Sequence, residues 1–369
     1  MNIKKKFTII QVLPYLNSGG VEKGTIEIAS YLSKNKHNSI VISGGGRLLR
    51  DLEKGGSEHI LLNIGKKSPS VILCILKLIQ IIFVVKPDII HARSRLPAWI
   101  VYLTLKLIPK TKRPFFVTTV HGFNSVSFYS SIMTKGDKVI AVSESIKNFV
   151  LKKYKVDEQK IIVIHRGVPD NLNRNFNIQK HKKWIVNFQK NYPSLKNKKI
   201  LLFPSRISRN KGVEEFVKLI NTLRKNQANI IGLMVGEAGS KNYLRELEQH
   251  IKDLGLKEDI IFLGFRNDIY NIMKYSNIIF AIQRVPESFG RIVIEGIKLG
   301  IPVIGYDHGG VGEQLRTLFP LGLVEYGKFQ KVYTLTRKFL NKKPRIIKTN
   351  KFTLGEMKRK TFEVYKSFY

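Results

Sequence analysis

The sequence predicts an α/β protein made of two Rossmann-like, parallel-sheet domains. Three observations lead to this prediction. Short apolar runs alternate with longer helical patterns up to residue 165, a polar segment follows, and the same alternation then starts again. The length of 369 residues leaves roughly 150 to 200 residues for each domain, which is enough to bury a core.

The first 165 residues are predicted to form βαβ units. Short apolar runs bounded by polar or turn residues predict buried strands, whereas apolar residues three or four apart predict helices. Alternation of this kind gives a parallel sheet with helices on both faces. The predicted strands are 7–13, 39–43, 88–91, 115–120, 138–142 and 161–164, and the predicted helices are 20–34, 71–85, 97–107 and 145–153.

Residues 166–199 are polar, basic and rich in Asn, which predicts a linker with one helix over 182–189. The alternation then restarts and predicts a second parallel sheet. Its predicted strands are 200–203, 230–235, 260–263, 278–281 and 302–305, and its predicted helices are 213–225, 241–254, 268–275 and 291–299.

The predicted domains are therefore 1–165 and 166–349, followed by a terminal segment, 350–369. An amphipathic helix over 354–368 is too short to be a domain and must pack on one. In open α/β sheets, ligands bind outside the carboxyl ends of the strands. We therefore expect the functional site in the cleft between the two domains.

Lys and Arg outnumber Asp and Glu by 64 to 27, which gives a formal net charge of +37. A charge of this size attracts nucleic acid, anionic membranes or phosphorylated substrates. Nucleic-acid proteins more often concentrate basic and aromatic residues on one element, whereas this excess is densest at 166–200 and 337–348 and thin elsewhere. The alternative is a solvated surface that reflects only a Lys-rich composition.

The longest apolar run, Val71 to Val85, has 15 residues and is broken by Lys77 and Gln80. A spanning helix needs roughly 20 residues, so the run predicts a buried or interfacial helix. The first apolar stretch imitates a signal peptide but lacks a cleavage site, which favours a buried strand. The single cysteine, Cys74, predicts a reducing compartment such as the cytoplasm.

Two loops at predicted helix starts favour phosphate binding. Gly19 and Gly20 open the first helix, where backbone N–H groups favour an anion, although an ordinary tight turn is the alternative. Arg206 and Lys211 lie five residues apart after the first strand of the second half. A guanidinium and an ammonium so placed can clamp a diphosphate, although a Lys-rich chain also forms basic loops by chance.

A third loop carries two carboxylates, because the segment 286–296 places Glu287 and Glu295 eight residues apart. If a helix begins near Phe289, both carboxylates can face one cleft. They can then bind sugar hydroxyls while the N–H groups of Phe289 and Gly290 face a phosphate. The alternative is a helix-start acid followed by an exposed helix acid.

In their order along the chain, these motifs resemble those of the family 4 retaining glycosyltransferases, and the resemblance covers nearly the whole sequence. Shorter segments at 91–99, 118–123 and 136–143 are similar to bacterial lipopolysaccharide core enzymes, including mannosyltransferase-like members. The resemblance implies the GT-B architecture, in which two domains face across a cleft and the C-terminal helix crosses back to the first. The segments that carry it are the Gly19–Gly20 loop, 164–170, 205–212, 262–265, 286–296 and 306–313.

The resemblance also implies roles for individual residues. Arg206 and Lys211 would hold the donor diphosphate, and Glu295 the ribose hydroxyls. Catalytic roles fall to Glu287, which would hold the transferred sugar, and to His121, which would contact the donor sugar. The further implied donor contacts are Gly19 and Gly20 from the opposite domain, Gly236, Phe265 and Arg266 near the base, and the backbone of Phe289 and Gly290 at the sugar and its phosphate.

The implied reaction transfers a hexose from a UDP- or GDP-sugar to a glycan acceptor with retention, by same-face attack. Fixed cations can stabilise the leaving diphosphate, and the sequence has no Asp-x-Asp pair, so no metal or other cofactor is expected. The basic loop argues against a glycosidase that uses Glu287 and Glu295 as acid and nucleophile. A nucleotide-sugar epimerase and a nucleic-acid-binding protein are the alternatives.

His91, Arg93 and Arg95 follow another predicted strand end, where an acceptor would enter. We expect them to contact an anionic, lipid-linked glycan, such as a lipopolysaccharide core; surface charges at a helix start are the alternative. Cations beside the apolar helices would add about 1 kcal/mol each of attraction to anionic lipid. We thus expect a cytoplasmic enzyme at the inner face of the membrane that binds no nucleic acid; its cations are Lys106, Lys110, Lys112 and Arg113.

Overall fold

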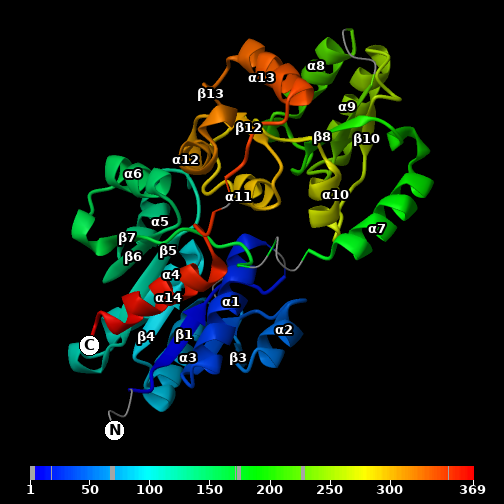
Figure 1. Cartoon of the computed structure of the whole chain (residues 1–369). Helices are drawn as coiled ribbons and strands as arrows, with labels where there is room; N and C mark the ends of the chain where they lie inside the picture. The colour runs from blue at the N-terminus through cyan, green and yellow to red at the C-terminus, as the bar shows by residue number, and fades with distance from the viewer. Residues whose placement is uncertain are drawn as a thin grey trace. The chain divides into compact units, whose positions relative to one another are not determined.

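The computed structural model describes residues 5–17, 19–66, 71–170, 172, 176–225, 229–347 and 349–369, in two compact units. Unit 1 comprises Met1–His165 together with Gly355–Tyr369, and unit 2 comprises Arg166–Leu354 (Figure 1). Each unit is a parallel sheet covered by helices. The predicted α/β class is confirmed.

The sheet of unit 1 has seven strands in the order β3-β2-β1-β4-β5-β6-β7. The strands are β1 Thr8–Val12, β2 Asn38–Ser43, β3 Glu58–Leu61, β4 Ile89–Ala92, β5 Phe115–Val120, β6 Lys138–Ala141 and β7 Ile161–Val163. The helices are α1 Gly20–Lys34, α2 Leu49–Lys54, α3 Val71–Val85, α4 Arg95–Leu107, α5 Phe128–Ser131, α6 Glu144–Lys153 and α14 Leu354–Lys366, with the short turn η1 at Lys110–Lys112.

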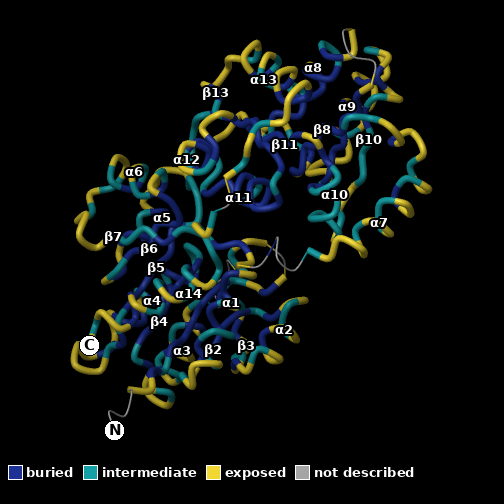
Figure 2. Tube along the Cα trace, viewed as in Figure 1, coloured by how far each residue is buried: buried dark blue, intermediate teal, exposed yellow. Residues whose placement is uncertain are grey.

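The central strands of unit 1 are buried on both faces, as expected for a parallel sheet (Figure 2). The predicted strands of this unit all form. Strand β3 and helix α2 were not predicted. Strand β3 lies at the sheet edge and is only partly buried, so its sequence Glu-His-Ile-Leu gives no apolar run.

The sheet of unit 2 has six strands in the order β10-β9-β8-β11-β12-β13. The strands are β8 Lys199–Phe203, β9 Ile230–Met234, β10 Ile260–Phe262, β11 Ile278–Ala281, β12 Val303–Tyr306 and β13 Leu323–Val324. The helices are α7 Ile178–Asn191, α8 Val213–Arg224, α9 Lys241–Asp253, α10 Ile269–Tyr275, α11 Arg291–Lys298, α12 Gly309–Leu318 and α13 Phe329–Asn341.

Unit 2 differs from the prediction in three places. Helix α7 is longer than predicted, because the Asn177 side chain accepts from the Lys180 N–H and caps it four residues earlier, before Ile178. Helix α11 begins at Arg291 rather than near Phe289, since Gly290 adopts a left-handed conformation at φ 72°. Helices α12 and α13 and strand β13 were not predicted.

Helix α14 packs within unit 1 although it lies at the end of the chain. Tyr365 is fully buried, and its hydroxyl lies 2.6 Å from Nδ1 of His91 at the end of β4. Near the other end of the sheet, the rings of Phe115 and Phe368 stack with centroids 4.3 Å apart. These contacts hold the helix that was predicted over 354–368 against unit 1.

Both sheets have a topological switch point, where the strand order reverses. It lies between β1 and β4 in unit 1 and between β8 and β11 in unit 2. Ligands in open α/β sheets bind outside the carboxyl ends of the strands at such points. The segments that follow these four strands carry Gly19, Arg93, Arg206 and Glu287.

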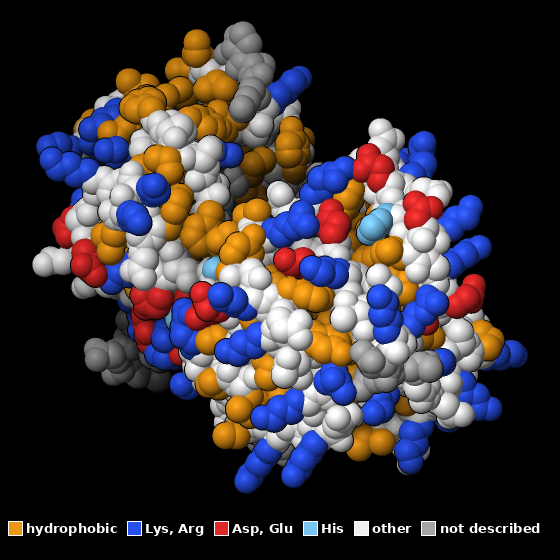
Figure 3. All heavy atoms as spheres, turned by 90° about the horizontal axis from the view of Figure 1, so that it is seen from above, with side chains coloured by type: hydrophobic (Ala, Val, Ile, Leu, Met, Phe, Trp, Pro, Cys, Tyr) orange, Lys and Arg blue, Asp and Glu red, His pale blue; other side chains and the backbone are white. Residues whose placement is uncertain are grey.

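Figure 3 shows Lys and Arg side chains spread over the visible face rather than gathered on one element. Among the described residues, no helix is both long enough and apolar enough to cross a bilayer. Cys74 is buried in α3, as the sequence indicated.

Candidate active site

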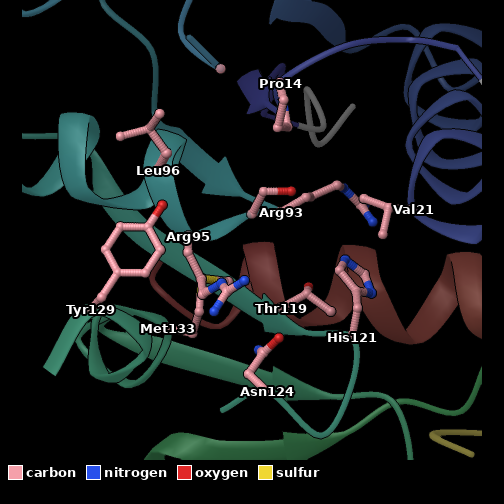
Figure 4. A pocket seen from close by; sticks show the side chains of 12 residues that line it. Pro14, Val21, Arg93, Arg95, Leu96, Thr119, His121, Asn124, Tyr129 and Met133 are labelled. Carbon is pink, nitrogen blue, oxygen red and sulfur yellow. The ribbon is translucent and has the colours of Figure 1, made fainter. Parts of the chain in front are cut away.

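Unit 1 has a cavity of about 340 Å³ at its switch point (Figure 4). Arg93 enters from the end of β4, Arg95 from the start of α4 and His121 from the end of β5. No Asp or Glu lines the cavity within the described part of the chain. The cavity is thus basic and suits an anionic group. Its remaining lining residues are Pro14, Val21, Gly65, Ser94, Leu96, Thr119, Asn124, Tyr129 and Met133.

The Arg93 side chain is only 4% exposed, and hydrogen bonds fix its position. Its Nε donates to Oε1 of Gln11 over 2.8 Å, and Nε2 of Gln11 donates to the Thr25 carbonyl over 3.1 Å. Burial lowers the pKa of Arg93, and the neighbouring Tyr365 opposes that shift. Gln11 is a polar residue inside an otherwise apolar strand, and this feature of the sequence indicates that it binds a buried polar partner, here Arg93.

Arg95 is oriented by polar and aromatic contacts. Its Nη1 donates to the Ser130 hydroxyl over 3.0 Å, and its guanidinium lies 5.2 Å from the Tyr129 ring centroid. Both partners come from the segment at α5, which the sequence did not predict. Arg93 and Arg95 therefore reach one cavity from preorganised positions.

The structure corrects the expectation for His91. This residue is fully buried, and its Nδ1 and Nε2 lie 2.6 Å from the Tyr365 and Thr119 hydroxyls, respectively. It does not line the cavity. His91 joins β4 to α14 and β5, so we keep only Arg93 and Arg95 as acceptor candidates.

The glycine loop of unit 1 precedes α1. Ser18 of this loop lies outside the described residues, whereas Gly19 and Gly20 are described. Gly19 has φ 137°, and a Cβ there would lie 2.5 Å from the Glu22 carboxylate. A Cβ at Gly20 would meet open space. A ligand can therefore approach the backbone at Gly20.

In unit 2, three loops at the carboxyl edge of the sheet are joined backbone to backbone. The Arg206 loop follows β8, and the Ile207 N–H donates to the Glu237 carbonyl over 3.0 Å. The Gly236 loop follows β9, and the Gly236 N–H donates to the Gly264 carbonyl over 2.9 Å. A Cβ at Gly236 would lie 2.3 Å from the Ser205 carbonyl oxygen, so only glycine fits there.

Arg206 is exposed at this edge, whereas the other predicted cation is paired. The ammonium of Lys211 forms an ion pair with the carboxylate of Glu287, and both side chains are about one-fifth exposed. The pair joins the loop after β8 to the loop after β11. An ammonium has three donors, so Lys211 can hold Glu287 and still bind a phosphate oxygen.

Glu295 is 7% exposed in α11, where the sequence had left burial open. Its Oε1 accepts from Arg291 Nε over 2.7 Å and from the Tyr270 hydroxyl over 3.1 Å. Burial lowers the pKa of Arg291, but the Glu295 carboxylate and Tyr270 together outweigh burial and leave that pKa raised. Neither partner was predicted from the sequence, although the i,i+4 spacing of Arg291 and Glu295 indicates the first.

The Glu287 loop rests on the glycine-rich start of α12. The Gly310 N–H donates to the Glu287 carbonyl over 2.6 Å. A Cβ at Gly309 would lie 2.5 Å from that carbonyl oxygen, and one at Gly310 would lie 2.3 Å from the Phe289 backbone. The segment 306–313 thus shapes the backbone that carries Glu287, Phe289 and Gly290.

The two residues expected near the nucleotide base of the donor, Phe265 and Arg266, differ in how exposed and how paired they are. Phe265 is 65% exposed beside the Gly264 turn. Arg266, in contrast, donates to both oxygens of Asp268 over 2.8 and 2.7 Å, and Trp184 donates to the same carboxylate over 2.8 Å. Phe265 is available to stack on a ring, while Arg266 is committed to Asp268.

Within the described ranges, no three His, Cys, Asp or Glu side chains gather into a group that could hold a metal. At the carboxyl edge of the unit 2 sheet, the segment after β8 carries two cations, Arg206 and Lys211. Such an arrangement stabilises negative charge.

Comparison with known proteins gives the class. Residues 18–172 match the family described as Glycosyltransferase Family 4, and residues 186–342 match Glycosyl transferases group 1. The chain belongs to the family 4 glycosyltransferases and has their GT-B fold. The resemblance of the motifs to family 4 glycosyltransferases is thereby confirmed, while the similarity to lipopolysaccharide core enzymes stays a prediction.

Among solved structures, a glycosyltransferase from Rickettsia africae is 35% identical and superposes with a TM-score of 0.85, covering 98% of each chain. An Anabaena protein, HepE, solved with UDP and glucose, is 20% identical with a TM-score of 0.78, over 98% of this chain and 100% of that one. The second similarity shows the fold alone.

A Staphylococcus aureus capsular polysaccharide biosynthesis glycosyltransferase, CapM, is 22% identical over 86% of this chain and 84% of its own. An uncharacterised glycosyltransferase of Methanocaldococcus jannaschii is 27% identical over 53% of this chain. That match spans 48% of the archaeal protein, and the match to a Bacillus anthracis N-acetylglucosaminyl malate synthase spans 59% of that protein.

Proposed function

We propose that the protein is a retaining, metal-independent glycosyltransferase that moves a hexose from a UDP- or GDP-sugar to a glycan acceptor. The observation that carries the proposal is the loop cluster of unit 2, where Arg206, Lys211 and the two carboxylates lie at one edge of the sheet. Family membership supports transfer, and the UDP bound to the Anabaena relative supports a nucleotide donor.

In this proposal Arg206 and Lys211 bind the donor diphosphate. Breaking the glycosyl–phosphate bond builds negative charge on that diphosphate, and fixed cations stabilise it. Glu295, already oriented by Arg291 and Tyr270, offers its second oxygen to the ribose hydroxyls. Arg206 and Lys211 would supply the positive charge that a divalent metal supplies in metal-dependent enzymes.

Retention follows from same-face attack in this proposal. Glu287 and the backbone of Phe289 and Gly290 hold the sugar, and the leaving phosphate takes the proton from the attacking acceptor hydroxyl. The new glycosidic bond forms as the phosphate bond breaks. His121 and the Gly19–Gly20 loop of unit 1 would contact the same donor.

The cavity of unit 1 supports an anionic acceptor in this proposal. Arg93 and Arg95 are fixed there without a lining carboxylate among the described residues. A sugar acid or a phosphate on a lipid-linked glycan fits this chemistry. We therefore propose a cell-envelope glycolipid, such as a lipopolysaccharide core, as the acceptor, and the inner face of the cytoplasmic membrane as the location.

The experiment is a product assay with UDP- and GDP-hexoses and bacterial core glycolipids. We expect acceptor-dependent release of nucleoside diphosphate, an unchanged rate in the presence of a chelator, and the same anomeric configuration in donor and product. Conversion of the nucleotide sugar in the absence of acceptor would instead identify an epimerase. An inverted product or a rate abolished by chelator would contradict the proposed mechanism.

A further inference from the structure

Helix α3 exposes an apolar face to solvent. Its buried residues, Cys74, Leu78 and Ile82, lie on the opposite side and pack into the core of unit 1. At 3.6 residues per turn, the exposed positions from 72 to 84 cover about 140° of the helix circumference. The exposed apolar residues and their exposed fractions are Ile72 67%, Leu73 61%, Leu76 53%, Phe83 43% and Val84 82%.

Helix α4 extends this face. It packs against α3 and adds exposed Leu103 and Leu107. Large apolar side chains gathered in this way mark interaction surfaces in proteins, whereas scattered ones do not. We call α3, α4 and η1 with these side chains the α3–α4 face.

Cations border the α3–α4 face. The Lys112 ammonium in η1 lies 5.6 Å from the Phe83 ring centroid, which places η1 beside α3. The Lys106 ammonium lies 5.4 Å from the Tyr102 ring centroid in α4. Arg113 donates to the Ile108 carbonyl over 2.6 Å and holds the turn in place. Further exposed cations are Lys77, Lys86 and Lys110.

Acidic side chains are nearly absent from this segment of the sequence. Between residues 71 and 113, Asp88 is the single acid. Its carboxylate accepts from the Thr8 N–H over 2.8 Å and lies 3.4 Å from the Lys5 ammonium, so its charge is compensated. The face is therefore mostly apolar, with Gln80 the exposed uncharged polar side chain of α3 among the apolar ones, and it is positive at its border.

We infer that the α3–α4 face docks on an anionic phospholipid bilayer, with the apolar side chains entering the interface and the lysines contacting headgroups. A surface helix with an apolar face and flanking lysines has the chemistry of an interfacial segment. A protein partner would need acidic groups arranged to match five lysines, whereas a bilayer meets them with mobile anions. The inference deepens the proposed function, on whose glycolipid acceptor it rests, by naming the surface that reaches the membrane.

The test is flotation of the full chain with phosphatidylcholine vesicles, with and without phosphatidylglycerol, at low and high salt. The wild-type chain is expected to bind only the anionic vesicles at low salt. Leu73→Ser with Leu76→Ser should weaken binding by roughly tenfold. Separately, Lys106→Gln with Lys110→Gln and Lys112→Gln should weaken it by roughly a hundredfold, because each lysine contributes about fivefold.

Helix α7 of unit 2 provides a matched control. It exposes Val186, which is 70% exposed, as well as Lys182, Lys183 and Lys190. Ile178→Ser with Val186→Ser removes two exposed apolar side chains from α7, since Ile178 is 65% exposed, and the triple Lys→Gln variant of α7 removes the same charge. They should bind vesicles like the wild type, and an equal loss in both sets would show a general charge effect and overturn the inference.

Two further outcomes would also overturn it. One is wild-type protein that does not bind anionic vesicles, and the other is α3 variants that lose self-association but bind vesicles normally, which would assign the face to a second copy. Thermal stabilisation by nucleotide sugars should be equal in the wild type and all these variants. Its absence from the wild type would refute the proposed donor, while the vesicle result would still test the face.

Discussion

The two units share an architecture but present their charges differently at the switch points. In unit 2 the acids and cations are largely paired with one another, as in Lys211 with Glu287 and Arg291 with Glu295. In unit 1, Arg93 and Arg95 are held by neutral partners, Gln11 and Ser130. This difference supports the proposal that unit 2 binds a ligand with both hydroxyls and phosphates and that unit 1 binds an anionic group.

The largest expected effect tests how tightly the loops of unit 2 are packed. Gly212 has φ 78°, and a Cβ there would lie 2.0 Å from the Ile282 carbonyl oxygen. Gly300 has φ 75° but open space around it. Gly212→Ala should lower the free energy of unfolding by about 3 kcal/mol, whereas Gly300→Ala should cost about 1 kcal/mol from backbone conformation alone. Urea unfolding measures both, and equal losses would refute the crowding at Gly212.

The next effect tests the anion-binding role of unit 1. Removing a charged donor from a ligand carboxylate or phosphate costs about 2 kcal/mol, or roughly thirtyfold in binding. Arg93→Gln should therefore raise the KM for the acceptor by that factor and leave the KM for the donor unchanged. Steady-state kinetics measures both constants, with Arg93→Lys as the variant that keeps the charge. An unchanged acceptor KM in Arg93→Gln would contradict the proposed anion-binding role of unit 1.

A smaller effect compares two i,i+4 ion pairs. Arg291 pairs with the buried Glu295 of unit 2, and Arg359 pairs with Glu363, whose side chain is 45% exposed, on α14 of unit 1. Arg291→Leu should cost about 1 to 2 kcal/mol of stability and weaken donor binding, because it leaves Glu295 buried beside Tyr270 alone. Arg359→Leu should cost less than about 0.5 kcal/mol. Thermal unfolding with and without donor distinguishes them.

The smallest effect is a pH dependence shared by the units. Burial is the main cause that lowers the pKa of His37 and His59 in unit 1 and of His181 and His308 in unit 2 from 6.5. The unfolded chain then binds more protons below pH 6.5, so stability is complete above that pH and falls as the pH drops.

Urea midpoints across this pH window measure the loss. His308→Gln should flatten the pH dependence of stability, because it removes one titrating group. A Gln amide can still donate to the Gln283 carbonyl, which lies 2.8 Å from His308 Nε2. A steeper dependence in His308→Gln would contradict the assigned sign.

The predicted strands formed because buried parallel strands carry continuous apolar runs, such as those of β1 and β8. Strand β3 was missed because it lies at an edge. Helix α12 was missed because its Gly-Gly-Val-Gly start serves close packing on the Glu287 loop rather than helix propensity. Local pattern therefore predicts the core of each sheet better than its edges.

The candidate site was predictable only in part. Loop position and residue type located Arg206, Glu287 and Arg93, because strand ends are visible in the sequence. The contact of His91 with Tyr365 joins residues 274 positions apart, and no local pattern reveals it. Because of that contact, His91 joins β4 to α14 and does not line the cavity where an acceptor was expected.

The most direct test of the central claim is thermal unfolding of the full chain with UDP-, GDP- and ADP-sugars and with duplex DNA. We predict that one class of nucleotide sugar raises Tm, that Arg206→Ala and Lys211→Ala abolish the shift, and that DNA has no effect. Stabilisation by DNA with none by any nucleotide sugar would contradict the assignment of unit 2 as a donor-binding domain.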